Sequence, residues 1–255
     1  MYDALEPIIC EAGALAARYF DRLSGLTIES KGHLDLVSEA DREVEKLIGT
    51  RLRAAFPGDG IFGEEGVAEH SRSGRAWIVD PIDGTFNFLR GSDHWAVSIG
   101  LRDGTQPRFG AVYVPERDQL MIGGPGQGVR LNGKALPKRV GLDRTKAACS
   151  VGFHPSIPTA EQTEALRFIL DDARMTFRNT GSAVTGLIDV ATGAVDGYLG
   201  LGISTWDLMA MVPILAELGA ETTLDWDKIA LDDKLRFACG TPEFLEIFAP
   251  LARRW

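Results

Sequence analysis

Apolar residues recur at helical spacing in two stretches near the start of the chain. The first stretch predicts an amphipathic helix over residues 3–22. Its apolar positions are Leu5, Ile8, Ile9, Ala12, Leu15, Ala16, Tyr19 and Phe20. The second stretch predicts a helix after Ser38, a residue type that is common at the N-cap. Its apolar positions are Val44, Leu47, Ile48, Leu52, Ala55 and Phe56.

Short β-rich runs separated by turn residues follow in the middle of the chain. Runs at residues 95–101, 109–114 and 119–124 predict a meander of strands. Asn132-Gly133 predicts a short hairpin after them. The basic residues that follow predict a boundary near residues 140–146, so we expect one half over 1–143 and a second half over 144–255.

The second half alternates strand and helix signals. Residues 208–218 are apolar on nearly every side, which predicts a buried helix, and Pro213 is expected to kink it. Residues 181–183 could open another helix with its first N–H groups facing a ligand, or could simply be closely packed. Further strands and helices are expected at residues 148–153, 158–171, 235–240 and 243–255.

Length and composition are those of an ordinary globular protein. The chain has 255 residues, 45% of them hydrophobic, which is enough for a substantial core without disulfide support. Its three cysteines lie far apart and form no C-x-x-C pair, which argues against a zinc site or a disulfide framework and favours a cytoplasmic location. No apolar run reaches about 18 residues, so we expect no membrane span. A net charge of −9 argues against nucleic-acid binding.

The most informative stretch is AWIVDPIDGTFNFLRG at residues 76–91. Its apolar start predicts a buried strand that ends at Asp80-Pro81, because proline removes a ladder donor. Asp80 and Asp83 then lie across a turn, directly before a possible helix start at Gly84-Thr85. Two carboxylates beside free backbone N–H groups suit a divalent metal that holds a phosphate, although a simple turn would also explain them.

Three other acids are candidates for the same site. Asp41 lies in a first helical turn, Glu64 lies between glycines, and Asp207 begins the buried helix. Each has a simpler interpretation as a dipole-complementing residue, a solvated turn or a cap. The D-x-x-D spacing of Asp80 and Asp83 also differs from the D-x-D of phosphatases that use an aspartyl nucleophile. Both acids are therefore interpreted as metal ligands.

In this order, the segments DLVSEAD, GEEG, VDPIDGT and STWD resemble the inositol monophosphatase family of magnesium-dependent phosphatases. The resemblance runs from the first helix to near the last. It implies a mixed α/β (α+β) fold, a layered α/β/α/β/α sandwich of the inositol monophosphatase and fructose bisphosphatase type. It also implies a homodimer and a small phosphorylated substrate.

The resemblance also implies a set of site residues. Two or three Mg²⁺ ions would be held by Glu64, Asp80, the carbonyl of Ile82, Asp83, Asp207 and, more peripherally, Asp41. The catalytic residues would be Glu64, Thr85 and Asp80. The substrate contacts would be Asp83, Gly84, Thr85, Gly181, Ser182 and Ala183. Lys31 matches a lysine in the mobile loop of the family.

Physical chemistry agrees with this arrangement. Mg²⁺ prefers oxygen ligands and keeps several waters, so carboxylates and a substrate phosphate suffice without histidine or cysteine. Two metals can clamp an in-line displacement in which one activates the water and the other stabilises the leaving oxygen. Glu64 and Thr85 would orient that water and help to deprotonate it.

The substrate is less well defined by the sequence. An acid that contacts sugar hydroxyls in inositol-specific members is replaced here by Gly200. The FNFLRG segment nevertheless resembles inositol phosphatases, whereas Pro213 resembles members that act on histidinol phosphate. We therefore expect an inositol or similar sugar phosphate first, histidinol phosphate second and a nucleotide third. The alternative from another class is a non-catalytic binding partner of the transcription machinery.

Overall fold

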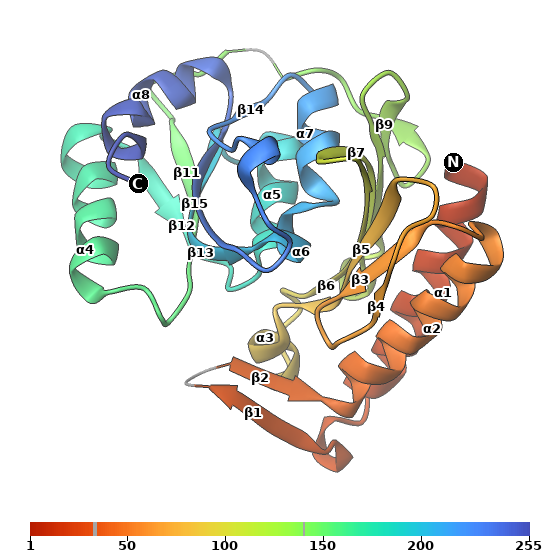
Figure 1. Cartoon of the computed structure of the whole chain (residues 1–255). Helices are drawn as coiled ribbons and strands as arrows, with labels where there is room; N and C mark the ends of the chain where they lie inside the picture. Colours follow the sequence, from red (N-terminus) through yellow and green to blue (C-terminus); the bar gives the residue numbers. More distant parts are fainter. Residues whose placement is uncertain (33–34, 140) are drawn as a thin grey trace.

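Two helices, α1 (Tyr2–Phe20) and α2 (Glu39–Ala55), lie side by side on the outside of the molecule (Figure 1). The computed structural model describes the chain apart from residues 33, 34 and 140 and the side chains of residues 31 and 35, so the expected position of Lys31 lies outside the described part. Both helices confirm the predicted apolar periodicity, since the predicted positions Leu5, Ile9 and Ile48 are fully buried. These two helices therefore cover one face of the first sheet.

The first sheet has eight strands in the order β10-β9-β8-β7-β6-β5-β3-β4. Only β3 and β5 pair in parallel; the other described neighbours are antiparallel, as expected for a meander. The strands are β3 (Gly60–Gly63), β4 (Ala68–Glu69), β5 (Arg75–Asp83), β6 (Ala96–Asp103), β7 (Gln106–Val114), β8 (Gln119–Gly124), β9 (Gly128–Leu131) and β10 (Lys134–Ala135). The hairpin predicted at Asn132-Gly133 joins β9 to β10.

The second sheet has five strands in the order β12-β11-β13-β15-β14. Strand β11 pairs in parallel with both of its neighbours, while β15 is antiparallel to β13 and β14. The strands are β11 (Ala148–Phe153), β12 (Thr176–Arg178), β13 (Gly197–Ser204), β14 (Glu221–Thr222) and β15 (Lys234–Gly240). The two sheets divide between residues 135 and 148, and the assignment of two separate domains stays a prediction.

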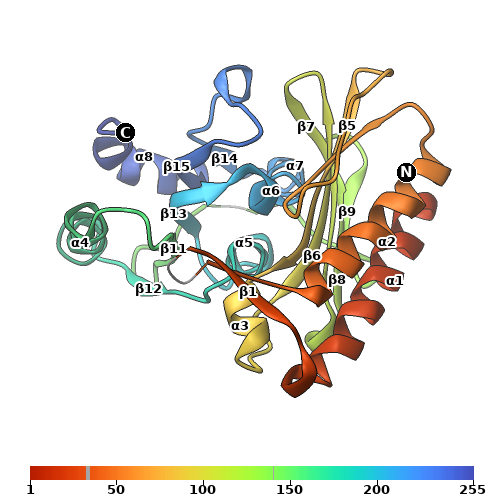
Figure 2. The same cartoon turned by 60° about the horizontal axis from the view of Figure 1, so that its bottom comes forward.

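The remaining elements complete a layered sandwich. Between the sheets lie α5, α6 and α7, and outside the second sheet lie α4 and α8 (Figures 1 and 2). The layers run α/β/α/β/α, as expected. These elements and the connecting ones are α3 (Thr85–Leu89), α4 (Thr159–Arg167, continued by π-helical Phe168–Asp172), α5 (Ala183–Thr192), α6 (Thr205–Leu208), α7 (Met211–Glu217), α8 (Pro242–Ala252), the β1–β2 hairpin (Ile28–Gly32 and Asp35–Ser38) and 3₁₀ turns at Leu23–Gly25, Pro115–Arg117 and Trp226–Lys228.

Two predictions about proline were wrong. Strand β5 does not end at Asp80-Pro81 but continues to Asp83, and its register with β6 shifts between Asp80 and Asp83. Pro81 lies where this register shifts. The pairing of β5 with β6 is irregular there, so the sheet does not require the backbone N–H that proline lacks. The helix expected over residues 208–218, with a kink at Pro213, is instead interrupted at residues 209–210, between α6 and α7. Pro213 lies in the first turn of α7, where backbone N–H groups need no intrahelical partner.

Cys10, Cys149 and Cys239 are all free thiols. Among the described residues, no helix combines the length and the apolarity needed to cross a bilayer.

Candidate active site

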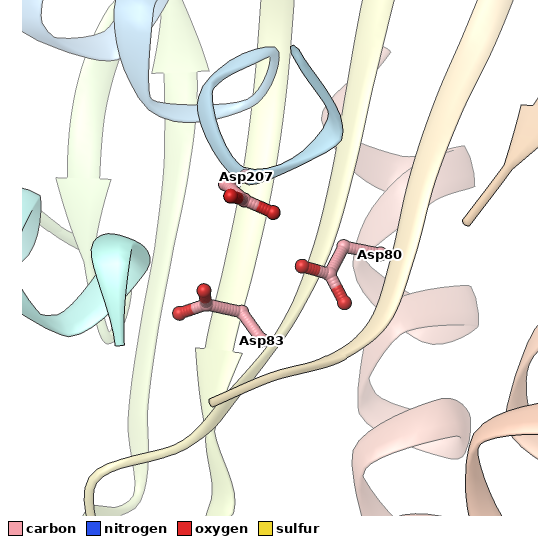
Figure 3. A group of neighbouring side chains, drawn as sticks. All are labelled: Asp80, Asp83 and Asp207. Atoms are coloured by element: carbon pink, nitrogen blue, oxygen red, sulfur yellow. The ribbon is translucent and has the colours of Figure 1, made fainter. Parts of the chain in front are cut away.

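Three carboxylates from distant parts of the sequence meet between the two sheets. Asp80 and Asp83 come from the end of β5 and Asp207 from α6, and one carboxylate oxygen of each lies within 4.8 Å of those of the other two (Figure 3). Asp80 and Asp83 are only 1% and 6% exposed. Such a buried group of acids needs positive charge nearby, and its all-oxygen donor set fits Mg²⁺.

The irregular end of β5 aims its two acids at the same point. Between Asp80 and Asp83 the backbone folds back, and the N–H of Ile82 donates to Asp80 Oδ1 at 3.1 Å. Gly84 follows with φ of 86°, a left-handed conformation that favours glycine. A Cβ on Gly84 would lie 2.8 Å from the carbonyl oxygen of His94, so the close approach also requires glycine.

Asp207 is held by its own helix. It occupies the third position of α6, where its Oδ2 accepts the backbone N–H of Ser204 at 3.0 Å in a capping box. The Nζ of Lys234 donates to Ser204 Oγ at 2.6 Å, on the neighbouring strand. The simpler interpretation of Asp207 as a cap is therefore correct, and the same carboxylate also reaches the acid group.

The N-terminus of α5 meets Asp83 rather than open space. Ala183 and Val184 donate their backbone N–H groups to the Asp83 carboxylate at 3.1 and 2.9 Å, and the Ser182 hydroxyl donates to it as well. Asp83 thus joins the first half of the chain to the second. The expected contacts of Gly181, Ser182 and Ala183 with a substrate stay predictions.

Two of the remaining expected ligands, Glu64 and Ile82, line a cavity of about 180 Å³. Its walls include Glu64, the three clustered aspartates, Ile82, Gly84 and Thr85. Asp41 does not line this cavity. Its carboxylate accepts hydrogen bonds from the N–H and hydroxyl of Ser38 at 2.8 and 2.6 Å, in a capping box that confirms Ser38 as the N-cap of α2.

Thr85 connects Asp41 to the cavity. Its Oγ1 lies 3.2 Å from Asp41 Oδ1 and 2.9 Å from the carbonyl oxygen of Ile82. The Thr85 hydroxyl has a single proton, so it donates a hydrogen bond to one of these two oxygens at a time. Its own oxygen keeps the capacity to accept a hydrogen bond from another group. The role of Asp41 as a peripheral metal ligand stays a prediction.

Burial and mutual repulsion shift the acids in the same direction. Burial raises the pKa of Asp80, and the nearby carboxylates of Glu64, Asp83 and Asp207 raise it further. Burial and then Asp207 raise the pKa of Asp83 to about 7, against the lowering effect of the hydrogen bonds from α5. Burial raises the pKa of Asp207 to about 6, although Ser204 and Lys234 oppose it.

These shifts predict how the metal-free protein responds to pH. The folded-state pKa values exceed the value of about 3.9 for an unfolded aspartate. At pH values between the unfolded-state and folded-state pKa, the folded state therefore binds more protons than the unfolded state. The contribution of these groups to the free energy of unfolding is complete below about pH 4 and is lost as pH rises through about 6 for Asp207 and about 7 for Asp83.

Bound Mg²⁺ offsets the charge of these carboxylates, so the difference in Tm between samples with Mg²⁺ and with chelator should grow by several degrees from about pH 5 to about pH 8. Calorimetry at constant ionic strength measures it, and a difference that shrinks over this range would contradict the prediction.

Glu45 is a buried acid that the sequence analysis missed. It lies on α2, is 3% exposed, and accepts the backbone N–H groups of Glu65 and Val67 at 2.8 and 2.9 Å. A Cβ on Gly63 would lie 2.2 Å from Glu45 Oε2, so the glycine makes room for this carboxylate. Glu45 therefore orients the loop that carries Glu64. The sequence feature that could have pointed to Glu45 is its position one helical turn after Asp41, on the same face of α2.

Replacing Glu45 with glutamine should weaken the site without destroying the fold. An amide offers one acceptor oxygen in place of two, so one of the two loop N–H groups loses its partner. We expect kcat/KM to fall about tenfold and the Mg²⁺ concentration for half-maximal activity to rise. Glu43→Gln on the exposed face of α2 is the matched control. A fall in Tm with unchanged Mg²⁺ dependence would assign Glu45 a purely structural role.

Comparison with known protein families agrees with the geometry. The model of the inositol monophosphatase family matches residues 1–246. The chain belongs to this family. It is 32% identical over 240 residues to the inositol-1-monophosphatase of Bacillus subtilis, an alignment that covers 92% of this chain and 89% of the relative. It is also 32% identical over 210 residues to the Nus factor SuhB of Xylella fastidiosa, covering 82% and 76%.

Solved structures extend the comparison to the fold. The extragenic suppressor protein suhB of Bartonella henselae superposes with a TM-score of 0.86 at 29% identity, over 98% of this chain and 96% of that one. Membership of the family and these relatives identify the chain as a phosphatase that acts on phosphate monoesters. The family is generally magnesium-dependent, and the group of Asp80, Asp83 and Asp207 could hold a metal ion.

Proposed function

We propose that the chain hydrolyses a phosphate monoester of a small alcohol by direct attack of a water molecule, with Mg²⁺ as cofactor. The observation that carries the proposal is the convergence of Asp80, Asp83 and Asp207 on a cavity that Glu64 and Thr85 also line. Among the described residues that line the cavity, the two acids of β5 have the D-x-x-D spacing of Asp80 and Asp83 and not the D-x-D spacing of an aspartyl-nucleophile phosphatase. The proposal therefore involves no covalent phosphoenzyme.

The residues that would hold Mg²⁺ are those predicted from the sequence. We assign Glu64, Asp80 and the Ile82 carbonyl to one ion and Asp80, Asp83 and Asp207 to a second, with Asp41 near a possible third. Among the described residues that line the cavity, Lys234 is the one lysine or arginine, against the four carboxylates of Glu64, Asp80, Asp83 and Asp207, so the site favours added positive charge. When bound there, Mg²⁺ neutralises phosphate charge and lowers the pKa of the attacking water.

The side chains of the chain orient the water and the substrate. Glu64 would accept a proton from the water, and Thr85 would fix its position through the hydroxyl that lies between Asp41 and Ile82. Backbone groups of Gly84 and Thr85, which line the same cavity, would contact the phosphate. Gly181, Ser182 and Ala183 would contact the alcohol that leaves.

The resemblance of FNFLRG to inositol phosphatases makes an inositol or similar sugar phosphate the first substrate to test, and histidinol phosphate the second. A function in another class is supported by several relatives, because the proteins from Xylella fastidiosa, Escherichia coli and Haemophilus influenzae are named Nus factor SuhB. A protein that acts only through a transcription partner has no physical need for a complete set of metal-binding acids. We also propose a homodimer, which sedimentation at several concentrations would test.

A substrate panel tests the proposal. Phosphate release from myo-inositol 1-phosphate, histidinol phosphate, fructose 1,6-bisphosphate and adenosine 3′,5′-bisphosphate is measured with Mg²⁺ and with chelator. We expect turnover that depends on Mg²⁺, and a hundredfold preference in kcat/KM, about 3 kcal/mol, would identify the substrate. Turnover unaffected by the chelator would contradict the proposal. A polymerase pull-down that survives loss of the acid group would favour the binding function.

A further inference from the structure

A second cavity, of about 390 Å³, adjoins the acid group. Asp83, Asp207, Phe86, His154 and Gly181 line both cavities. A phosphate held by the acid group would therefore extend its alcohol into the larger cavity. The volume is typical of a site for a ring-sized ligand.

The walls of the larger cavity away from the acids are mostly apolar. They include the side chains of Phe86, Phe153, Pro155 and Ile203, together with Gly152 and Gly202, which add no polar side chain. Phe86 is 43% exposed although it is a large apolar residue, and it lies at the junction of the two cavities. An exposed aromatic ring beside a catalytic cavity is a surface for a flat ligand.

The position of Gly200 shows why a polyol contact is missing. A Cβ there would lie 2.3 Å from Phe237 Cε1 and 2.9 Å from Ile203 Cγ1. Phe237 is fully buried and its ring stacks on that of Tyr198, with centroids 5.6 Å apart. The space that a longer side chain would need is therefore filled by core residues, and Gly200 does not line the cavity.

Apart from the acids, the polar side chains that line the larger cavity are those of His154, Asn179, Ser182 and Tyr198. The Ser182 hydroxyl donates to Asp83, and the Tyr198 hydroxyl is buried without a hydrogen-bond partner among the described residues. Among the described lining residues, the carboxylates are Asp83 and Asp207, and both belong to the acid group. Asn179 Oδ1 accepts the N–H of Gly181 at 3.0 Å, and His154 Nδ1 lies 2.7 Å from the hydroxyl of Ser156. A polyol would exchange most of its hydrogen bonds to water for apolar contacts and a few such side chains, and a cationic amine would find no further acid among the described lining residues.

We propose that the larger cavity binds an uncharged aromatic ring. The preferred substrates are then phosphate monoesters of neutral alcohols that carry a flat aromatic or heteroaromatic ring, in preference to inositol or histidinol. This inference rests on the proposed phosphatase reaction and specifies the alcohol that the reaction releases. Phe86 and Phe153 would contribute aromatic contacts to this ring, and Pro155 and Ile203 would contribute aliphatic contacts.

Three esters with similar leaving oxygens separate ring recognition from chemistry. Benzyl phosphate, cyclohexylmethyl phosphate and myo-inositol 1-phosphate all release an aliphatic alcohol, so intrinsic reactivity changes little among them. With Mg²⁺ we expect kcat/KM to be highest for benzyl phosphate, about tenfold above the inositol ester, with the cyclohexyl ester between them. Preference for the inositol ester would overturn the inference and leave the phosphatase reaction intact. No Mg²⁺-dependent turnover of any of the three esters would overturn both.

Two phenylalanine variants locate the effect. Phe86→Ala should lower kcat/KM about tenfold for benzyl phosphate and less than about twofold for the inositol ester. Phe177→Ala on β12 is the matched control, because Phe177 is 38% exposed and lines neither cavity. An equal loss for all three esters in Phe86→Ala would overturn the stacking role, since it would mean that Phe86 supports the catalytic turn.

Discussion

Replacing Asp80 with asparagine should reduce Mg²⁺-dependent kcat/KM by about three orders of magnitude. Asp80 is the residue proposed to contact both metal ions, and it is almost fully buried among Glu64, Asp83 and Asp207. An amide keeps the shape of the side chain but removes the negative charge that attracts Mg²⁺. Steady-state kinetics over a range of Mg²⁺ concentrations measures the loss.

The same variant has a second, opposite effect on stability. Without Mg²⁺, Asp80→Asn removes one of several buried like charges, so its Tm above about pH 7 should exceed that of the native chain. Asp103→Asn, at the exposed end of β6, is the control for a surface carboxylate. Near-native turnover of Asp80→Asn would refute the metal assignment, whatever its Tm.

Replacing Gly110 with valine should lower the free energy of unfolding by about 3 kcal/mol or more. Gly110 lies on β7 of the first sheet, and a Cβ there would be 2.0 Å from the carbonyl oxygen of Ala210. On the adjacent strand, a Cβ on Gly100 would be 2.4 Å from the carbonyl carbon of Met209. The junction of α6 and α7 therefore packs directly on the sheet backbone, and any side chain must push it away.

Urea denaturation measures the loss, and Gly110→Ala provides a milder step if the valine variant does not fold. Because the displaced junction directly follows the helix that carries Asp207, the alanine variant should also need more Mg²⁺ for half-maximal activity. Gly25→Val is the control, since a Cβ on Gly25 would meet nothing within 4 Å. Equal stability of the Gly110 and Gly25 variants would show that the junction adapts without cost.

Much of the fold was predictable because its signals are local. Helices α1 and α2 follow from apolar spacing along a few turns, and their predicted faces are buried. The hairpin at Asn132-Gly133 follows from two residues that adopt positive φ, 49° and 76°. Proline was the main source of error, because the effect of Pro81 and Pro213 depends on which hydrogen bonds their surroundings require.

The acids of the site were recognisable from the sequence, but their arrangement was not. Order and spacing pointed to Asp80, Asp83 and Asp207, which the structure brings together. Glu45 shares a face of α2 with Asp41, but that position does not reveal that its carboxylate accepts hydrogen bonds from backbone N–H groups 20 and 22 residues away and so orients the Glu64 loop. The link from Asp83 to the start of α5 spans about 100 residues and was equally invisible.

By itself, the sequence determined which segments form helices and strands, which family the chain resembles and which acids are candidates for metal binding. These properties depend on side-chain chemistry and on contacts between near neighbours in the chain. Only the tertiary structure decided which surfaces face the acid group. The apolar cavity beside it is formed by residues 86, 153, 155 and 203. Those residues come from both halves of the chain, and they become neighbours only when the two sheets pack around the central helices.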